Sequence, residues 1–343
     1  MKVSIGIIAL NEEKNLPTIF DNILNQTYPL ENIELILVDG MSTDNSKVLM
    51  SDFQKDYSSK FLQIKLFDNP IRIQAAGWNI VIENSECDVI IRLDAHAIIP
   101  CDFVSENIAC IKSGEEICGG TLIQKIDSDR KMSKVCLTAE TSMFGGSPAS
   151  FRRNGKKEYV KTLALGCYKK EVFETVGLFN ENLLRSEDNE MHFRIRKNGY
   201  KICLSDNISY EYFIRPTLNK MVKQKYGNGK WIGITSVKLT PSIFSWYHFI
   251  PLLFVLGMIS CIITACVGFA FPLWTLWFCL PLIIVSGMYF ILIEFIALVE
   301  AIRGKSLLNF LLLPLIICCL HISYGFGTFV GVLLAPFKRF VNY

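Results

Sequence analysis

The sequence lacks the cysteine patterns that hold metals or disulfide frameworks. It contains 12 cysteines in 343 residues, but no two of them form a C-x-x-C pair. The cysteines before residue 242 are scattered and odd in number, which disfavours both a zinc ribbon and a disulfide-rich scaffold. We therefore expect most of them to be reduced, small apolar core residues.

Glycine-rich phosphate-binding loops are also missing. No G-x-G-x-x-G follows the first apolar run at 2–9, and no Walker A sequence occurs anywhere in the chain. These absences disfavour Rossmann-type dinucleotide binding and P-loop phosphate chemistry. The diphosphate of any nucleotide bound here would need a metal ion and basic side chains instead.

Charge is scarce in the last hundred residues. Three apolar segments at about 247–271, 273–299 and 307–334 each exceed the roughly 20 residues that span a bilayer. We therefore expect a domain over 1–241, with a basic juxtamembrane segment at about 215–241, and a membrane domain over 242–343 with two or three transmembrane helices. After residue 241 the only charged residues are Glu294, Glu300, Arg303, Lys305, Lys338 and Arg339.

The topology of this membrane domain has two solutions. The apolar run near the N-terminus stops at 11–13 without a small-residue cleavage site, so we expect a buried strand and not a signal peptide. The domain over 1–241 should then be cytoplasmic. Three crossings would place Lys338 and Arg339 outside, against the positive-inside rule. A third segment that re-enters, broken at Pro314 or at the glycines 325, 327 and 331, would remove the conflict.

The segment 215–238 carries six basic residues and no acidic one. Near a membrane such residues attract anionic headgroups by about 1 kcal/mol per charge. Some of them could instead meet a phosphorylated substrate, and the sequence leaves both interpretations open.

Residues 1–241 show the pattern of an α/β domain. Apolar runs at 2–9, 33–38, 62–67, 88–93 and 117–123 alternate with helical patterns near 12–26, 43–54, 71–83 and 101–112. This alternation indicates βαβ units and a mostly parallel sheet.

Polar side chains follow several of these strands. Asp94 and His96 end the strand at 88–93, and residues i and i+2 of an extended segment share a side, so both could face one ion. An ordinary polar turn would look the same. Asp39 follows the second strand and could accept hydrogen bonds from a base or ribose. Asp188 lies in a predicted first helical turn, where Ser186 is a plausible N-cap and Glu190 can pair with Arg194.

Taken in order along the chain, these segments resemble family 2 glycosyltransferases with the GT-A fold over about residues 2–235. The membrane tail and the 142–146 loop are similar to the branch that contains a succinoglycan glucosyltransferase. The segments that carry the resemblance are VSIGIIALNEE (3–13), VDGMSTD (38–44), RLDAH (92–96), GCYKKEVF (166–173), VGLFNE (176–181) and the Glu187-Asp188 helix.

The resemblance implies roles for individual residues. Ala9, Glu12 and Asp39 match positions that line the base and ribose, with Asp39 as the expected uracil contact. Asp94 and His96 occupy the D-x-D motif, which binds ribose and a divalent ion on the diphosphate. Asp188 matches the catalytic base of inverting members.

Two departures from the family pattern matter. His96 replaces the usual second aspartate, and an imidazole favours Mn²⁺ over Mg²⁺. The Q-x-x-R-W motif of processive synthases is absent, which argues against processive polymerisation; Lys225 and Lys230 stand near its position, and we expect them to assist binding of the donor diphosphate.

The expected activity is a metal-assisted single displacement with inversion at a plasma-membrane protein. The donor is a nucleotide-diphospho-sugar, expected to be a UDP-sugar, and the acceptor a lipid-linked, polyprenyl-diphosphate saccharide of exopolysaccharide, capsule or envelope synthesis. Anionic lipids are expected partners and nucleic acid is not. The alternatives are sugar transfer to a polyprenyl phosphate and a catalytically inactive membrane scaffold of the same fold.

Overall fold

The computed structural model describes residues 1–340 except 143, 147, 153–155, 216 and 272. The chain divides into two compact units, one formed by Met1–Lys125 and Ala149–Phe213 and the other by Ile126–Pro148 and Ile214–Tyr343. This division does not follow the expected boundary at 241/242. The described residues of the basic segment pack against the apolar helices of the second unit.

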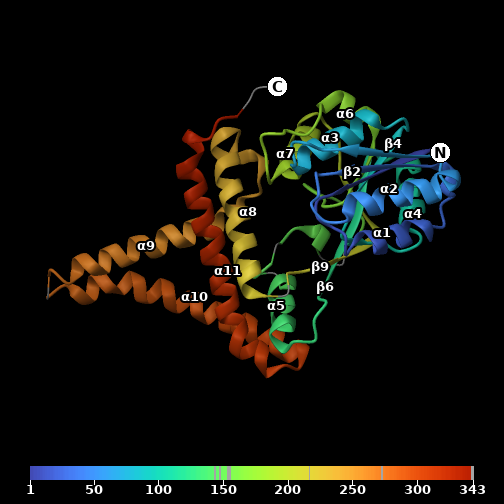
Figure 1. The fold of residues 1–343 in the computed structure, drawn as a ribbon. Coiled ribbons are helices and arrows are strands. Elements are labelled where there is room, and N and C mark those ends of the chain that lie inside the picture. The colour runs from blue at the N-terminus through green and yellow to red at the C-terminus, as the bar shows by residue number, and fades with distance from the viewer. Residues whose placement is uncertain (143, 147, 153–155, 216, 272, 341–343) are drawn as a thin grey trace. The chain divides into compact units, whose positions relative to one another are not determined.

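The first unit contains a mixed sheet with the strand order β3-β2-β1-β4-β8-β6-β9-β5, and β7 pairs with β9 (Figure 1). The long pairings β3–β2–β1–β4 and β6–β9 are parallel, and the short ones are antiparallel. The mostly parallel α/β sheet predicted from the sequence is thus confirmed. The strands are β1 Val3–Ala9, β2 Ile33–Asp39, β3 Gln63–Asp68, β4 Val89–Asp94, β5 Ala97–Ile98, β6 Ile117–Lys125, β7 Glu158–Tyr159, β8 Cys167–Lys169 and β9 Cys203–Phe213.

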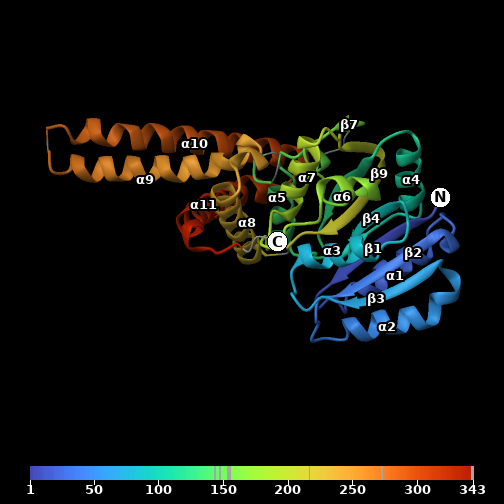
Figure 2. The ribbon, with the colours of Figure 1, turned by 90° about the horizontal axis from the view of Figure 1, so that it is seen from above.

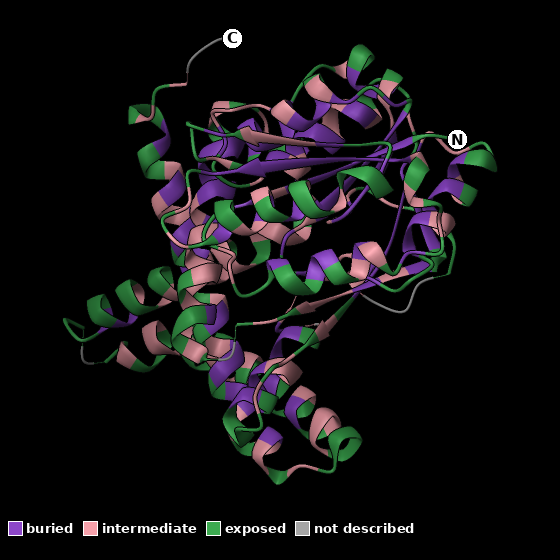
Figure 3. Ribbon diagram, turned by 45° about the vertical axis from the view of Figure 1, so that its right-hand side comes forward, coloured by how far each residue is buried: buried purple, intermediate pink, exposed green. Residues whose placement is uncertain are grey.

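Six α-helices of the described residues belong to this unit, and the first four lie where the sequence predicts them (Figure 2). Strand β2 is buried along its whole length, as expected for a parallel strand covered on both faces. Each fully buried Ile, Leu or Val contributes about 1.5–3 kcal/mol, so these strands anchor the core (Figure 3). The helices are α1 Leu16–Leu24, α2 Ser46–Tyr57, α3 Gln74–Asn84, α4 Phe103–Lys112, α6 Lys170–Val176 and α7 Glu187–Lys197.

An irregularity in the β6–β9 pairing sets the position of the C-terminal end of β9. The register shifts between Gly119 and Thr121, where β9 has extra residues. A Cβ at Gly120 would lie 2.2 Å from the carbonyl oxygen of Ile208, so only glycine fits there. After the shift, Tyr212 of β9 pairs with Ala97 of β5 and reaches the end of β4.

The second unit is helical in the described residues. Three of its helices are long and apolar enough to cross a membrane: Trp246–Gly268, Thr275–Gly304 and Leu307–Phe337. Of the two alternatives for the third segment, a break at Pro314 or at the three glycines does not occur, because α11 runs unbroken past them. The helices are α5 Lys131–Thr141, α8 Leu218–Lys238, α9 Ile250–Gly268, α10 Thr275–Gly304 and α11 Leu307–Leu334.

Candidate active site

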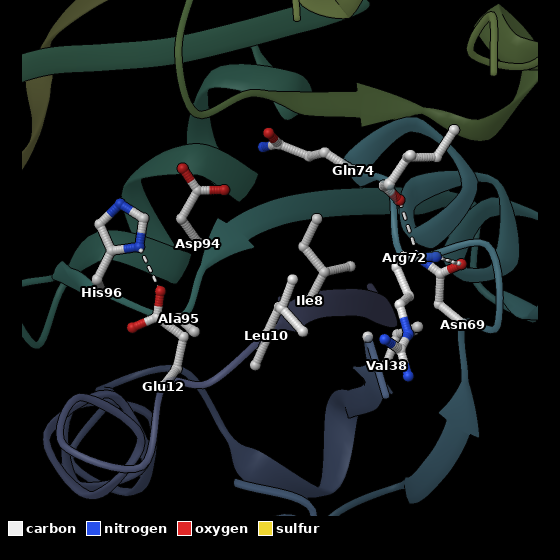
Figure 4. Close-up of a pocket in the computed structure, with 13 residues that line it drawn as sticks. Ile8, Leu10, Glu12, Val38, Asn69, Arg72, Gln74, Asp94, Ala95 and His96 are labelled. Atoms are coloured by element: carbon white, nitrogen blue, oxygen red, sulfur yellow. Dashed lines mark hydrogen bonds and ion pairs between the residues drawn. The ribbon is translucent and has the colours of Figure 1, made fainter. Parts of the chain in front are cut away.

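A cavity of about 230 Å³ opens at the carboxyl ends of β1, β2 and β4 (Figure 4). Ligands of open α/β sheets usually bind at this edge. Four of the residues predicted from the sequence line it: Ala9, Glu12, Asp94 and His96. Its other lining residues are Ile8, Leu10, Val38, Gly40, Asn69, Arg72, Ile73, Gln74 and Ala95.

The Asp94–His96 segment differs from its predicted geometry. Strand β4 ends at Asp94, and Ala95 and His96 form a turn, so the two side chains are not i and i+2 of one extended strand. The parallel register still sets Asp94 beside Ile8 of β1, and both side chains border the cavity. The predicted extended geometry is therefore wrong, and a shared ion site for these two side chains stays a prediction.

Neighbouring side chains orient both groups. The hydroxyl of Tyr212 donates a hydrogen bond to Oδ2 of Asp94, and the Tyr212 ring lies 5.0 Å from the His96 ring. Nδ1 of His96 lies 3.4 Å from Oε1 of Glu12, as Figure 4 shows. About half of the His96 side chain (46%) is exposed, so its imidazole is accessible from the cavity.

Asp94 and His96 could hold a divalent cation only together with oxygens of a bound phosphate group. Among the described residues no group of three or more His, Cys, Asp or Glu side chains is placed to hold a metal ion. Asp94 and His96 together supply one carboxylate and one imidazole. Cations in phosphate chemistry are commonly held by one or two protein ligands and completed by water and phosphate oxygens. The pair therefore fits a cation that arrives with a diphosphate.

Asp39 lies behind the cavity wall and not on it. Its side chain is fully buried, and its two carboxylate oxygens lie 3.1 and 3.3 Å from the Ser42 amide nitrogen, which donates to them. Its neighbours Val38 and Gly40 line the cavity. A carboxylate can accept several hydrogen bonds, so Asp39 could bind a nucleotide base while it still accepts the bond from Ser42.

Lys225 and Lys230 belong to the second unit, on α8. Nζ of Lys225 lies 3.0 Å from the Glu140 carboxylate of α5, and both side chains are nearly buried. Lys225 thus has a carboxylate partner within its own unit. The expected role of these two lysines in donor binding stays a prediction.

Arg92 connects the end of β4 to Asp188, and sequence reasoning missed it. Nη1 of Arg92 lies 2.6 Å from Oδ1 of Asp188; the arginine side chain is 1% exposed and that of Asp188 25%. The guanidinium lies 4.4 Å from the Trp78 ring and 4.7 Å from the Phe179 ring, within cation–π range. The available signal was a lone arginine inside an apolar strand.

Burial governs the ionisation of the two acids that begin α7. It raises the pKa of Asp188 above the usual value, while the Arg92 guanidinium acts in the opposite direction. For Glu187, burial and then the charge of Asp188 raise the pKa to about 8. Within the described residues, Oε2 of Glu187 also has no hydrogen-bond partner. Glu187 is therefore largely protonated at neutral pH.

The start of α7 differs from the capping expected from the sequence. Ser186 precedes the helix, but its side chain makes no capping hydrogen bond, and its φ of 71° lies in the left-handed region. Such strain in a non-glycine residue costs on the order of 1–3 kcal/mol and is common at functional sites. The expected pair of Glu190 and Arg194 is confirmed at 2.7 Å.

Replacing Glu187 with glutamine should flatten the pH dependence of stability. The folded-state pKa of Glu187 lies near 8, above the usual 4.5, so its protonated form favours folding. The contribution of Glu187 to the free energy of unfolding should be fully present below about pH 4.5 and should be lost as pH rises through 8. The variant should lack this pH-dependent contribution, as measured by denaturant unfolding across that range.

The exposed Glu174→Gln variant is the control and should follow the parent protein. Equal pH slopes for the parent protein and the Glu187→Gln variant would show that Glu187 is ionised throughout.

Three lining residues after β3 also escaped prediction: Asn69, Arg72 and Gln74. The strand was predicted correctly, and its carboxyl end lies at the same sheet edge as those of β1 and β2. Applying the strand-end argument to the third strand would have found Asn69. Arg72, with φ of 61°, depends on a turn that the sequence does not specify.

The α/β sheet, with a cavity at the carboxyl ends of its strands, agrees with the family comparison. Residues 4–177 match the model described as glycosyl transferase family 2, so the chain belongs to that family and is a glycosyltransferase.

Two curated relatives are informative. The chain is 28% identical over 337 residues to a dolichyl N-acetyl-alpha-D-glucosaminyl phosphate 3-beta-D-2,3-diacetamido-2,3-dideoxy-beta-D-glucuronosyltransferase of Methanococcus voltae, covering 96% of this chain and 97% of the relative. It is 24% identical to the succinoglycan biosynthesis protein ExoA of Rhizobium meliloti, over 66% and 67% of the two chains. The expected similarity to the succinoglycan branch is confirmed.

Two solved structures share the fold. The mannosyltransferase PcManGT from Pyrobaculum calidifontis, in complex with GDP-Man and Mn²⁺, has a TM-score of 0.58 at 12% identity and covers 98% of this chain and 88% of its own. S. aureus TarS 1–349 in complex with UDP has a TM-score of 0.51 at 15% identity, over 92% and 90%. At these identities the likeness establishes the GT-A fold alone.

Proposed function

We propose that this protein transfers a sugar, with inversion, from a UDP-sugar to a lipid-linked saccharide at the membrane. The single observation that carries the proposal is the position of Asp94 and Arg92 on strand β4. Asp94 borders the cavity, and Arg92, two residues earlier on the same face of the strand, binds Asp188. One strand thus connects the proposed donor site to the proposed base.

The donor is proposed to bind in the cavity with its base near Ala9 and Asp39 and its ribose near Glu12 and Asp94. Arg72 brings a positive charge to the same cavity. Lys225 and Lys230 are proposed to add positive charge to the diphosphate when donor is bound. Asp94 and His96 would hold a divalent cation, Mn²⁺ in preference to Mg²⁺, which when bound neutralises charge on the leaving diphosphate.

Asp188 is proposed to take the proton from the acceptor hydroxyl. The hydroxyl oxygen then forms a bond to the anomeric carbon while the bond from that carbon to the diphosphate oxygen breaks. The electron pair of the broken bond leaves with the diphosphate, and attack from the opposite face inverts the configuration. Arg92 holds the Asp188 carboxylate in place and favours its charged form.

A lipid-linked acceptor agrees with the three helices that could cross a membrane. The relative that covers nearly the whole chain is named for transfer to a dolichyl-phosphate-linked saccharide. We propose a polyprenyl phosphate- or diphosphate-linked saccharide in exopolysaccharide, capsule or envelope synthesis. The protein would be a multi-pass protein of the plasma membrane with its first unit in the cytoplasm, and its basic segment would contact anionic lipids.

Transfer to a polyprenyl phosphate itself is the second candidate. Several relatives at 27% identity are undecaprenyl-phosphate 4-deoxy-4-formamido-L-arabinose transferases, but the match covers only 61% of this chain. The larger coverage of the saccharide-transferring relative favours the first proposal.

The test is a panel of radiolabelled UDP- and GDP-sugars incubated with membranes that contain the protein. A lipid product one sugar longer than a saccharide acceptor, identified by mass, supports the proposal. A single sugar on a lipid monophosphate supports the second candidate instead. Membranes with the Asp188→Asn variant are the control. No transfer from any donor, together with no binding of UDP and Mn²⁺ by calorimetry, would favour an inactive scaffold.

Substituting His96 tests the metal assignment. His96→Ala should raise the Mn²⁺ concentration needed for half-maximal activity by at least tenfold, in line with the 10–100-fold effects of perturbing metal-site groups. His96→Asp should restore activity and shift the preference towards Mg²⁺, because it replaces an imidazole with a carboxylate. Metal titrations of initial rates measure both. An unchanged requirement in His96→Ala would show that the imidazole is no ligand.

A further inference from the structure

Helix α11 exposes its large apolar side chains along one face, apart from Leu334 at its C-terminal end. The exposed large residues recur at intervals of four and seven, which places them along one stripe of a helix. The opposite face is buried, for instance at Leu313, Ile317 and Leu320. The stripe consists of Leu307, Leu311, Leu315, Ile322, Phe326 and Leu333.

Helix α10 has a different pattern. Its exposed apolar residues run consecutively around the helix, as at Ile283, Ile284 and Val285. In the most apolar stretches of α9 and α10, 11% of the residues are buried, compared with 33% in α11. The apolar residues of α9 and α10 are exposed around the helices, as in helices surrounded by lipid, whereas α11 exposes one stripe because its other face, which is also apolar, is packed within the unit.

The covered face of α11 packs directly on α8. Each helix contributes a G-x-x-x-G motif, formed by Gly229 and Gly233 on α8 and by Gly327 and Gly331 on α11. A Cβ at Gly229 would lie 2.1 Å from the Tyr324 carbonyl oxygen, and one at Gly331 would lie 2.0 Å from that of Lys230. The two backbones therefore touch, and α8 must share the environment of α11.

The charge of α8 is incompatible with the bilayer interior. It carries lysines at 220, 223, 225, 230 and 238 and no acidic residue. Lys220 and Lys223 are exposed, and Lys225 pairs with Glu140. A lysine at the bilayer centre costs about 2.5–3.5 kcal/mol even on the insertion scale. If α11 crossed the membrane, several lysines of α8 would enter the bilayer with it.

We propose that α8 and α11 lie together on the membrane surface and that only α9 and α10 cross the bilayer. The apolar stripe of α11 would rest at the boundary between headgroups and acyl chains, and the exposed Lys220 and Lys223 of α8 would meet anionic headgroups. Figures 1 and 2 show the α9–α10 hairpin projecting across the axis of the α8–α11 pair and not along it. The 19 residues of α9 span about 28 Å, close to the ~30 Å hydrocarbon core.

This topology places Lys338 and Arg339 on the same side of the membrane as Arg303 and Lys305. The positive-inside rule is then satisfied at both places. Nζ of Lys338 lies 4.3 Å from the Trp231 ring, which holds the segment after α11 against α8.

The proposal is tested by the sidedness of epitope tags on the full-length protein in sealed inside-out vesicles. One form carries a tag before Met1 and another carries it after Tyr343. An antibody that cannot cross membranes should bind both tags equally without detergent. A third form, with the tag in the exposed turn after Leu273, should bind antibody only after detergent is added.

A tag after Tyr343 that is protected like the one after Leu273 would overturn the proposal, because α11 would then cross. Binding in detergent shows that each tag can be recognised. The readout does not depend on sugar transfer, so its failure is distinguishable from failure of the proposed function. If the inserted tag prevents accumulation, the comparison of the two terminal tags still decides the outcome.

Discussion

Asp188→Asn is expected to lower the turnover number by about 10²–10⁴-fold, the usual contribution of a general base. The amide cannot accept the acceptor's proton, but it keeps the size of the side chain and can still accept a hydrogen bond from Arg92. Donor affinity, measured by calorimetry with UDP and Mn²⁺, should change little. Loss of turnover without loss of binding would mark an interaction needed only in the transition state.

The exposed Asp206→Asn variant on β9 is the control and should retain full turnover. If Asp188→Asn also retained it in purified enzyme, Asp188 would not be the base. A pH profile of kcat/KM should show an acidic limb above the usual aspartate pKa, because burial raises the pKa of Asp188.

Arg92→Met should cost both stability and activity. Removing one partner of a buried ion pair typically costs about 3–5 kcal/mol, because the remaining charge is left unpaired. Arg92 also acts to lower the pKa of Asp188, so its loss should move the acidic limb of kcat/KM to higher pH. Arg92→Lys keeps the positive charge but lacks the planar guanidinium. It should return the acidic limb of kcat/KM towards the parent pH more fully than it restores stability.

Two controls separate the positioning of Asp188 from a general structural role. Arg194→Met removes an ion pair with Glu190 on the same helix, and it should reduce stability without moving the acidic limb. The double variant Arg92→Met with Asp188→Asn leaves no unpaired charge at this place. It should regain stability relative to Arg92→Met but no turnover. An unmoved limb in Arg92→Met would refute the positioning role.

The fold was largely predictable because its signals are local. Strand β2 is a run of apolar residues that ends in Asp-Gly, and α2 follows with small polar residues before it. Such runs, alternating with helical patterns, predict parallel βαβ units from residues close in sequence. The sequence left open whether the third apolar segment is broken at Pro314, because the neighbouring helices that pack on α11 are far from it in the chain.

The site was predictable only where it depends on strand ends. Asp94 and His96 follow a predicted strand, so their arrival at one cavity could be expected. The bond from Tyr212 to Asp94 joins residues 118 positions apart, and that from Arg92 to Asp188 joins residues 96 apart. No periodicity in the sequence reports such pairs. The burial that raises the pKa of Glu187 is likewise a property of the packed structure.

The caged ion pair of Arg92 and Asp188 also constrains how this chain can change. With its guanidinium between Trp78 and Phe179, Arg92 has its carboxylate partner in Asp188. A copy of the chain released from selection for sugar transfer could not discard Asp188 alone without a folding penalty. Loss of the activity would therefore be expected to end with both residues replaced. A chain that had lost only one of them would fold poorly. The pair ties the capacity to fold to the capacity to react.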